Sequence, residues 1–525
     1  MRRLALLVLG ICLAAAAPGP APIHFTIAAD PATLNPLLAH ADASSVEQQL
    51  ARLVFEPFIE IDERGRAIPE LLQEIPTLAN GGLSRDGRTI VYRLRRGVRW
   101  SDGVPVTADD VLFTLDAIMD PHNPVRSRAG YDVIEGARKR SAYIVAVRLR
   151  RPWAPAVATF FSYGVAAQYV LPRHLLAGQR DLTQSPFGSH PVGNGPYLFA
   201  EWRRGDRLTY VANPRYWKGP PATPRLDVSI VPDPGTNLTL LQSGALAWNL
   251  IAPAQEPVVA RNPRLAFRNV PLALVAGIVL NTRHPPLDDA RVRRAIAAAI
   301  DREAISRKIA YGRYPVIDTA QPLGSWARDP TVHEPRFDPA AADRWLDDAG
   351  WKRGSGGMRA KDGKPLALVY VQFPETRTGV ATATFVQSEL RDRGIDVTLK
   401  SVANAQLFLP KTGVLARGDF DLAYVPLAMG TDPDDSFLFA CDGIANYARW
   451  CDRRVDALER EALATLARPA RARLYAAIAR AVASEVPIVF LFDPAYVYAY
   501  DRNLAGFAPS AFSPTWNAAG WRLSP

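Results

Sequence analysis

The chain has 525 residues, of which 48% are hydrophobic and 22% are charged, the balance of a globular protein. At ~150 residues per domain, this length predicts about three packing units. The 62 lysines and arginines outnumber the 52 acidic residues but are scattered, without a basic stripe between aromatic residues, so the composition argues against nucleic-acid binding.

The first residues, MRRLALLVLGICLAAAAPGPAP, have the pattern of an export signal. Two arginines precede an apolar run and an alanine-rich end, and cleavage after Ala16 satisfies the small-residue rule. We therefore predict a signal peptide at 1–16 and a mature protein that is periplasmic or otherwise extracytoplasmic. Lipid anchoring at Cys12 is the alternative, but Ile11 stands where a lipoprotein signal needs a small residue. We favour cleavage without lipidation.

Removal of the signal leaves two cysteines, Cys441 and Cys451. In an exported chain, two cysteines this close together predict a local disulfide, and two buried free thiols are the alternative. Closing so short a loop stabilises a protein by about 2–3 kcal/mol in the chain-entropy account. No other apolar run approaches the ~20 residues of a membrane-spanning helix.

The mature chain begins with an apolar strand, Ile23–Ala28, that runs into a polar loop punctuated by prolines. A helical pattern follows and ends near Pro57. Alternating apolar residues at 90–94 and 143–149 then predict strands. Between them Thr107 is expected to cap a helix, with Asp110 at its third position. These patterns predict one α+β unit.

A glycine-rich turn at 191–199, PVGNGPYLF, leads into a strand whose expected partner is Arg207–Val211. No helix follows this turn and the P-loop lysine is missing, which argues against phosphate binding.

A second α/β unit begins near Leu272 with the buried strand VAGIVLNT. The clearest helix of the chain, DDARVRRAIAAAIDREAISRKI, follows with Asp288 as its expected cap. Two further strands flank another helix, and this alternation predicts a mostly parallel sheet. An amphipathic helix and the strand Ile488–Phe492 come last, before an aromatic tail that we interpret as loops.

Catalytic and metal-binding motifs are missing from the sequence. The seven histidines are isolated, and neither a serine-hydrolase elbow nor a dinucleotide-binding glycine motif is present. The stretch LAMGTDPDD holds three acids but lacks the spacing and the glutamate of a calcium loop. We therefore expect a protein that is not an enzyme, without a cofactor or a bound metal.

Six blocks of the mature chain resemble, in order, one family: the family 5 extracellular solute-binding proteins of ABC importers for peptides, nickel and related solutes. The blocks are TLNPLLA, LSRDGRTIVYRLRRGVRWSDGVPVTADDVLFTL, PVGNGPYLFAEWRRGDRLTYVANPRYW, LNTRHPPLDDARVRRAIAAAIDREAI, GDFDLAYVPLAMGTDPDDSF and ANYARWCDRRVDALERE. The third carries Asn194 in place of the usual threonine.

The resemblance implies an α/β fold of the type II periplasmic binding protein kind. It has two lobes with a hinge, plus an extra α+β domain inserted in the first lobe. The expected boundaries are 17–55, 189–271 and 490–525 for the first lobe, 56–188 for the inserted domain, and 272–489 for the second lobe.

The resemblance also implies a function. A monomeric receptor would capture peptides or peptide-like solutes between its lobes and deliver them to an ABC permease in the membrane. A receptor for a sugar, a nickel chelate or an opine-like compound is one alternative, and an exported hydrolase is another.

The expected ligand-binding residues follow from position in the family. They are Thr33, Leu34 and Asn35 in the loop 29–35, with Trp248, Asn249, Asn281, Thr282, Met429, Gly430, Thr431 and Asp432. Arg207 and Arg283 are further candidates for meeting a ligand carboxylate.

The amine anchor is the main departure from the family. Peptide receptors place an aspartate four residues before the proline of the D-P pair, and that position here is Met429. An alignment gap would bring Asp432 into this role instead. Asp432 is therefore our candidate for meeting a cation.

Overall fold

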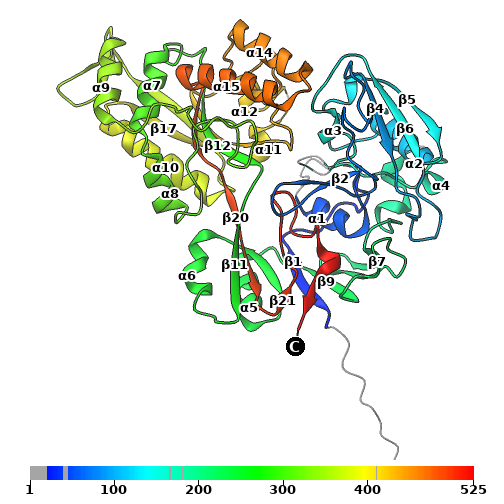
Figure 1. Cartoon of the computed structure of the whole chain (residues 1–525). Helices are drawn as coiled ribbons and strands as arrows, with labels where there is room; N and C mark the ends of the chain where they lie inside the picture. Colours follow the sequence, from blue (N-terminus) through cyan, green and yellow to red (C-terminus); the bar gives the residue numbers. More distant parts are fainter. Residues whose placement is uncertain are drawn as a thin grey trace, which may run out of the picture.

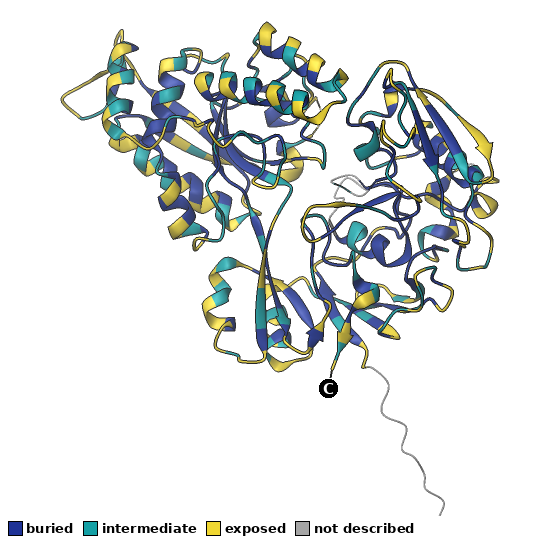
Figure 2. Cartoon of the chain, viewed as in Figure 1, coloured by how far each residue is buried: buried dark blue, intermediate teal, exposed yellow. Residues whose placement is uncertain are grey.

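The computed structural model describes residues 21–38, 45–162, 164, 167–179, 181–409 and 411–524. The predicted signal peptide at 1–16 and Cys12 lie outside these residues. Figure 1 shows two large bodies, with a small unit below them. We call the part around one main core, residues 21–271 and 495–524, the first body, and the part around the other, residues 272–494, the second body. Buried strands form the centre of each in Figure 2.

A four-stranded sheet in the order β1-β9-β8-β7 begins the first body. The predicted strand at residue 23 is present and pairs in parallel with a strand more than 200 residues further along the chain. The predicted pairing of the strand after the glycine-rich turn with the strand at Arg207 is also present. The elements are β1 (Ile23–Ile27), α1 (Ser45–Val54), β7 (Tyr197–Arg203), β8 (Arg207–Ala212) and β9 (Arg225–Ile230).

The segment between α1 and β7 forms the α+β unit that the sequence predicts. Thr107 and Asp110 cap its main helix reciprocally, because Asp110 Oδ2 accepts the Thr107 N–H at 2.8 Å and Thr107 Oγ1 accepts the Asp109 N–H at 3.3 Å. The elements are β2 (Ile59–Ile61), β3 (Ala67–Pro69), β4 (Thr89–Arg93), α2 (Ala108–Met119), β5 (Ile134–Ser141), β6 (Ile144–Leu149), α3 (Ala156–Thr159) and α4 (Arg173–Leu176).

A three-stranded antiparallel sheet in the order β10-β20-β11 forms the small lower unit of Figure 1. Its central strand, β20, lies in the tail that we predicted to be loops, so that prediction is wrong. Val497 and Ala499 face one small core, while Tyr496, Tyr498 and Tyr500 alternate with them and pack toward the main core of the first body, which is the two-residue period of a strand. The elements of this unit are α5 (Pro234–Ser243), β10 (Trp248–Ile251), α6 (Glu256–Val259), β11 (Leu265–Pro271) and β20 (Ala495–Asp501). The strands β21 (Leu504–Ala505) and β22 (Arg522–Leu523) pair with each other as a separate two-stranded sheet.

A five-stranded sheet in the order β17-β16-β18-β12-β19 forms the centre of the second body. β16 pairs in parallel with β17 and β18, and β12 runs antiparallel to its neighbours β18 and β19. Four of the five strands therefore run in one direction, as in the predicted mostly parallel sheet, and β12 is the exception. The local βαβ pattern did not show that β12 would lie between two strands of opposite direction. The strands are β12 (Leu274–Leu280), β16 (Ala367–Gln372), β17 (Asp396–Ser401), β18 (Leu422–Ala428) and β19 (Ile488–Phe492).

The helix predicted to follow β12 is in fact two helices, α7 (Ala290–Ala299) and α8 (Arg302–Ile309). Asp301 ends the run because its carboxylate accepts the Ala304 N–H at 2.8 Å and so caps a new helix. The cap of α7 is Asp289, one residue later than predicted. The remaining elements of this body are α9 (Pro339–Asp348), β13 (Lys352–Arg353), β14 (Arg359–Lys361), β15 (Lys364–Pro365), α10 (Arg377–Asp392), α11 (Asn404–Leu407), α12 (Val414–Arg417), α13 (Ser436–Phe439), α14 (Arg453–Ala464) and α15 (Arg468–Glu485).

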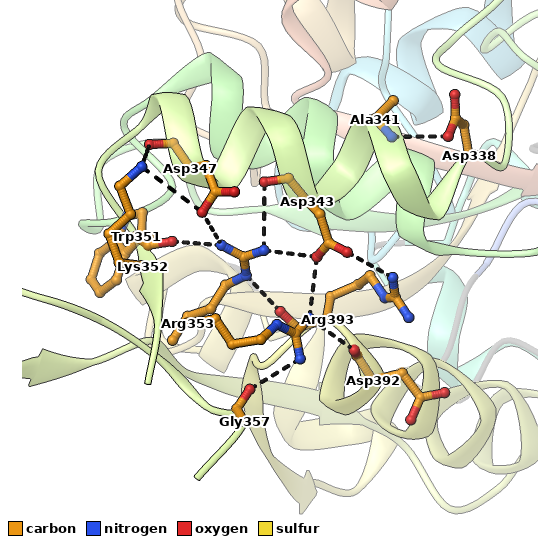
Figure 3. Close-up of polar contacts among 11 residues, drawn as sticks. Asp338, Ala341, Asp343, Asp347, Trp351, Lys352, Arg353, Gly357, Asp392 and Arg393 are labelled. Carbon is orange, nitrogen blue, oxygen red and sulfur yellow. Dashed lines mark hydrogen bonds and ion pairs between the residues drawn. The ribbon is translucent and has the colours of Figure 1, made fainter. Parts of the chain in front are cut away.

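A charged cluster ties α9 to the neighbouring hairpin and to the end of α10, and Figure 3 shows Asp343 and Asp347 pointing toward it from one side of α9. The almost fully buried Arg359 donates to both carboxylates at 2.8 Å. Arg393 donates to the second oxygen of Asp343 at 2.9 Å. The cluster compensates a buried guanidinium, so we regard it as structural.

The predicted disulfide between Cys441 and Cys451 is present. Among the described residues, we find no helix that is both long enough and apolar enough to cross a membrane.

Candidate functional site

The main cavity of the described residues has a volume of about 640 Å³ and lies where the two bodies meet. The first body contributes the loops around β2 and β3, the segment 154–162, and two residues of the C-terminal tail. The second body contributes the ends of β12, β18 and β19 and the start of α15. The lining segments are 59–75, 154–162, 271–273, 321–326, 429–433, 466–471 and 511–512, with Asp493.

The two bodies touch at the edge of this cavity. Thr431 Oγ1 donates to the carbonyl of Ala158 at 3.3 Å, and the Ala154 N–H donates to the carbonyl of Leu463 at 2.7 Å. These contacts join residues about 270 to 310 positions apart in the chain, so the arrangement depends on how the bodies close on each other.

The stretch that follows β18 shapes one wall. The Met429 N–H donates to the carbonyl of Ala273 at 2.9 Å, which keeps the chain beside β12 for one residue beyond the strand. Asp432 then accepts the Asp434 N–H at 3.1 Å, and Asp434 accepts the Ser436 N–H at 3.0 Å. The acids therefore form successive turns before α13. Met429, Gly430, Thr431 and Asp432, four of the predicted site residues, line the cavity.

Asp432 was predicted to meet a cation of the ligand, but in this structure its carboxylate binds a cation of the chain itself. Arg471, in the first turn of α15, donates to both carboxylate oxygens at 2.6 and 2.7 Å. Arg471 also donates to the hydroxyl of Tyr475 and the carbonyl of Ala462, each at 3.0 Å. This bidentate pair occupies the carboxylate that we assigned to a ligand amine.

Replacing Asp432 with asparagine is expected to lower the free energy of unfolding by about 1.5–3 kcal/mol, the range for hydrogen bonds to charged groups. The largely buried Arg471 would lose its counter-ion while keeping its positive charge. Urea denaturation measures the effect. Asp419→Asn is the matched control, since its pair with Arg417 is about half exposed and should change stability by less than about 1 kcal/mol. Equal effects of the two variants would contradict the prediction.

Trp326 adds an aromatic surface to the same wall. The guanidinium groups of Arg468 and Arg471 lie 4.8 and 5.5 Å from its ring centroid. Stacked guanidinium groups are weakly hydrated and present hydrogen-bond donors, so this wall suits a carboxylate or a carbonyl group. None of these three residues was predicted from the sequence. Arg471 lies in an ordinary amphipathic helix, and nothing local in the sequence marks it as buried.

The predicted residues of the N-terminal loop lie elsewhere. Thr33 Oγ1 and the Leu34 N–H both donate to the carbonyl of Gly188, at 3.2 and 2.7 Å. The side chain of Asn35 accepts the Leu37 N–H at 3.1 Å. These contacts hold the loop against the first body, and none of the three predicted residues lines the cavity. Their contact with a ligand stays a prediction.

Four other predicted residues also lie outside the cavity, within the two bodies. Trp248 stacks on Phe25 in the core, and Asn249 Oδ1 accepts the Leu250 N–H at 2.8 Å. Asn281 donates to two backbone carbonyls at 3.0 and 3.1 Å, and Thr282 donates to one at 3.0 Å. All four hold neighbouring segments in place. Arg207 and Arg283 do not line the cavity either.

A buried pair of acids lies behind the cavity wall. The carboxyl groups of Asp435 and Glu459 contact each other, and both residues are almost fully buried. Burial is the main cause that raises the pKa of Asp435 to about 7, and neighbouring Asp434 adds to it. Burial and then Asp435 raise the pKa of Glu459 well above its ordinary value. The pair therefore holds protons that the unfolded chain releases near pH 4.

This pair predicts a loss of stability as the pH rises. Between about pH 4 and pH 7 the folded state binds more protons than the unfolded state. The stabilisation that these protons give to the folded state is therefore complete below about pH 4 and is lost as the pH rises toward about 7. Glu459→Gln removes one of these groups. We expect the difference in unfolding free energy between pH 5 and pH 8 to shrink relative to the wild type, because one group that takes up a proton on folding is gone. Denaturation at both pH values measures it, and an unchanged difference would contradict the assignment.

Comparisons with known proteins identify the family. Residues 73–448 match the bacterial extracellular solute-binding proteins, family 5 Middle. Protein XP55 from Streptomyces lividans is 30% identical over 90% of this chain and 82% of its own length. The oligopeptide-binding protein AppA from Bacillus subtilis is 25% identical over 94% of this chain and 90% of its own length.

A solved structure confirms the predicted fold class. The ABC transporter substrate-binding protein CtaP from Listeria monocytogenes superposes with a TM-score of 0.85, covers 97% of this chain and 100% of its own, and is 20% identical. The chain belongs to the family 5 bacterial extracellular solute-binding proteins, the substrate-binding components of ABC transporters, and it is a binding protein and not an enzyme.

Proposed function

We propose that the chain captures short peptides or peptide-like solutes in the cavity between its two bodies and delivers them to an ABC permease. The name of AppA, an oligopeptide-binding protein, supports the solute class. The volume of about 640 Å³ lies within the range of pockets that hold small molecules, which favours short peptides over long ones.

The composition of the cavity wall carries this proposal. The wall combines the Asp432–Arg471 pair and Arg468 over Trp326 with apolar residues of the first body. A peptide presents charged ends, amide groups and side chains of mixed polarity. A wall that offers charges of both signs, stacked guanidinium groups and apolar surface matches these features.

The two chain crossings between the bodies supply a hinge. The chain leaves β11 for β12 near Pro271, and it returns from β19 to β20 near Pro494. The Leu272 N–H donates to the carbonyl of Pro494 at 2.9 Å, so the crossings lie side by side. A ligand that contacts both bodies would favour the closed form, which is the population shift that such receptors use.

The division into lobes at 17–55, 189–271 and 490–525, an inserted domain at 56–188, and a second lobe at 272–489 remains part of this proposal. β19 extends across the boundary between residues 489 and 490, and its residues pair with β12 of the second body. A boundary after Phe492 would keep this strand whole.

A ligand screen by thermal shift and calorimetry tests the proposal. The panel would hold defined peptides of two to five residues alongside sugars, nickel chelates and opines. A ligand present at 100 times its dissociation constant adds about 2.7 kcal/mol to stability. We expect the peptides to raise the melting temperature. A shift with any other class and none with peptides would replace the peptide proposal by that class.

A further inference from the structure

Two carboxylates line the cavity, Asp432 and Asp493, and three arginines accompany them. Arg471 is paired with Asp432, and Arg66 is paired with Asp62 at 2.7 Å. Arg468 lies over Trp326. Asp493 is therefore the cavity carboxylate without an arginine bound to it among the described residues.

Asp493 follows β19 at the crossing between the two bodies. Its exposed fraction is 0%, and its own N–H donates to the carbonyl of Pro315 at 2.9 Å. The Leu323 N–H donates to Oδ2 at 3.0 Å. In the described part of the chain, Oδ1 has no hydrogen-bond partner. A buried carboxylate oxygen that is left unpaired is costly, so a partner is expected to reach it.

The wall beside Asp493 is held in place by its own hydrogen bonds. Gln321 donates to the carbonyl of Pro433 and to Asp435 Oδ2, both at 2.9 Å, and it accepts from Ser325 Oγ at 2.7 Å. This network fixes the turn that presents the Leu323 N–H to Asp493. The carboxylate is thus oriented by the backbone before any ligand arrives, as in preorganised sites.

Arg328 is the charged group that acts on Asp493 from nearby. Burial is the main cause that raises the pKa of Asp493 to about 6, while the Leu323 N–H and Arg328 oppose the rise. No ion pair joins Arg328 to Asp493 in the described residues, and Arg328 Nε itself lacks a hydrogen-bond partner. At neutral pH the Asp493 carboxylate is therefore mostly ionised, and Arg328 acts on its negative charge without forming an ion pair with it.

We propose that Asp493 Oδ1 accepts a hydrogen bond from a protonated nitrogen of the ligand, so that the captured solutes carry an ammonium or guanidinium group. The inference rests on the proposed function, whose site it refines. It moves the cationic contact away from Asp432, which Arg471 already holds, to a carboxylate that the fold orients and leaves unpaired. A charge-assisted bond in a buried position discriminates strongly between protonated and neutral ligands.

The test measures discrimination by calorimetry. Trialanine with its free ammonium is compared with N-acetyl-trialanine, and agmatine serves as a cationic probe without a peptide group. We expect the wild type to prefer the free peptide at least tenfold, and Asp493→Asn to abolish that preference. Asp501→Asn, a mostly buried aspartate outside the cavity that pairs with Arg264, is the matched control and should keep the preference.

The outcomes separate the two proposals. A preference that survives in Asp493→Asn overturns the inference and leaves the peptide function standing. Binding of agmatine that Asp493→Asn abolishes, with no peptide bound, supports the inference and overturns the peptide function. Binding of neither class by the wild type overturns both. Melting curves of the ligand-free variant check its folding, and we expect Asp493→Asn to melt at or above the wild-type temperature because it removes an unpaired buried charge.

Discussion

Replacing Arg52 with methionine is expected to lower the free energy of unfolding by about 3–5 kcal/mol, the range for breaking a buried ion pair. The exposed fractions are 2% for the side chain of Arg52 and 0% for those of Glu56 and Glu60. Its guanidinium lies 3.1 Å from one carboxylate and 2.5 Å from the other. Methionine keeps most of the apolar stem of the arginine. The decrease in the free energy of unfolding therefore measures the cost of leaving Glu56 and Glu60 buried without their cation.

Urea denaturation at pH 7.5 measures this effect, with binding of the ligand as a check on the fold of the variant. Arg225→Met is the matched control. Its pair with Asp227 is partly exposed, at 45% and 22% of the two side chains, and should change stability by less than about 1 kcal/mol. Similar losses for the two variants would mean that the glutamates take up protons or water at little cost, which would contradict the prediction.

Replacing Trp248 with alanine should lower the free energy of unfolding by about 3–5 kcal/mol, the range for removing a buried aromatic side chain. Its exposed fraction is 2%, and its ring lies 4.8 Å from that of Phe25 and 5.2 Å from that of Phe507. Phe25 lies in β1 and Phe507 in the C-terminal tail. Alanine would therefore remove the packing contacts that join three segments distant in the sequence.

The same variant tests the ligand contact that the sequence predicted for Trp248. Because this residue lies outside the cavity, we expect the folded fraction of Trp248→Ala to bind ligand with unchanged affinity. Phe337→Ala, at a side chain that is 46% exposed, controls for the loss of an aromatic ring and should stay within about 0.5 kcal/mol of the wild type. Weaker binding without a loss of stability would restore Trp248 to the binding site.

Local features were predictable because their causes are local. The capping box at Thr107, the strand at Ile23, and the disulfide between Cys441 and Cys451 all depend on residues near one another in the sequence. The errors follow the same rule. The split after Ala299 required an aspartate to act as a cap inside a helical pattern, and β20 required a tyrosine-rich tail to join a sheet built elsewhere.

The sequence by itself determined the family, the binding rather than catalytic role, and the four residues from Met429 to Asp432 that line the cavity. Only the tertiary structure decided how the charges are used. Arg471, 39 residues away, neutralises Asp432, whereas Asp493 is buried at a crossing with one oxygen unpaired. The physical reason is that the burial and pairing of a charge depend on which distant segments surround it, and no local pattern encodes that.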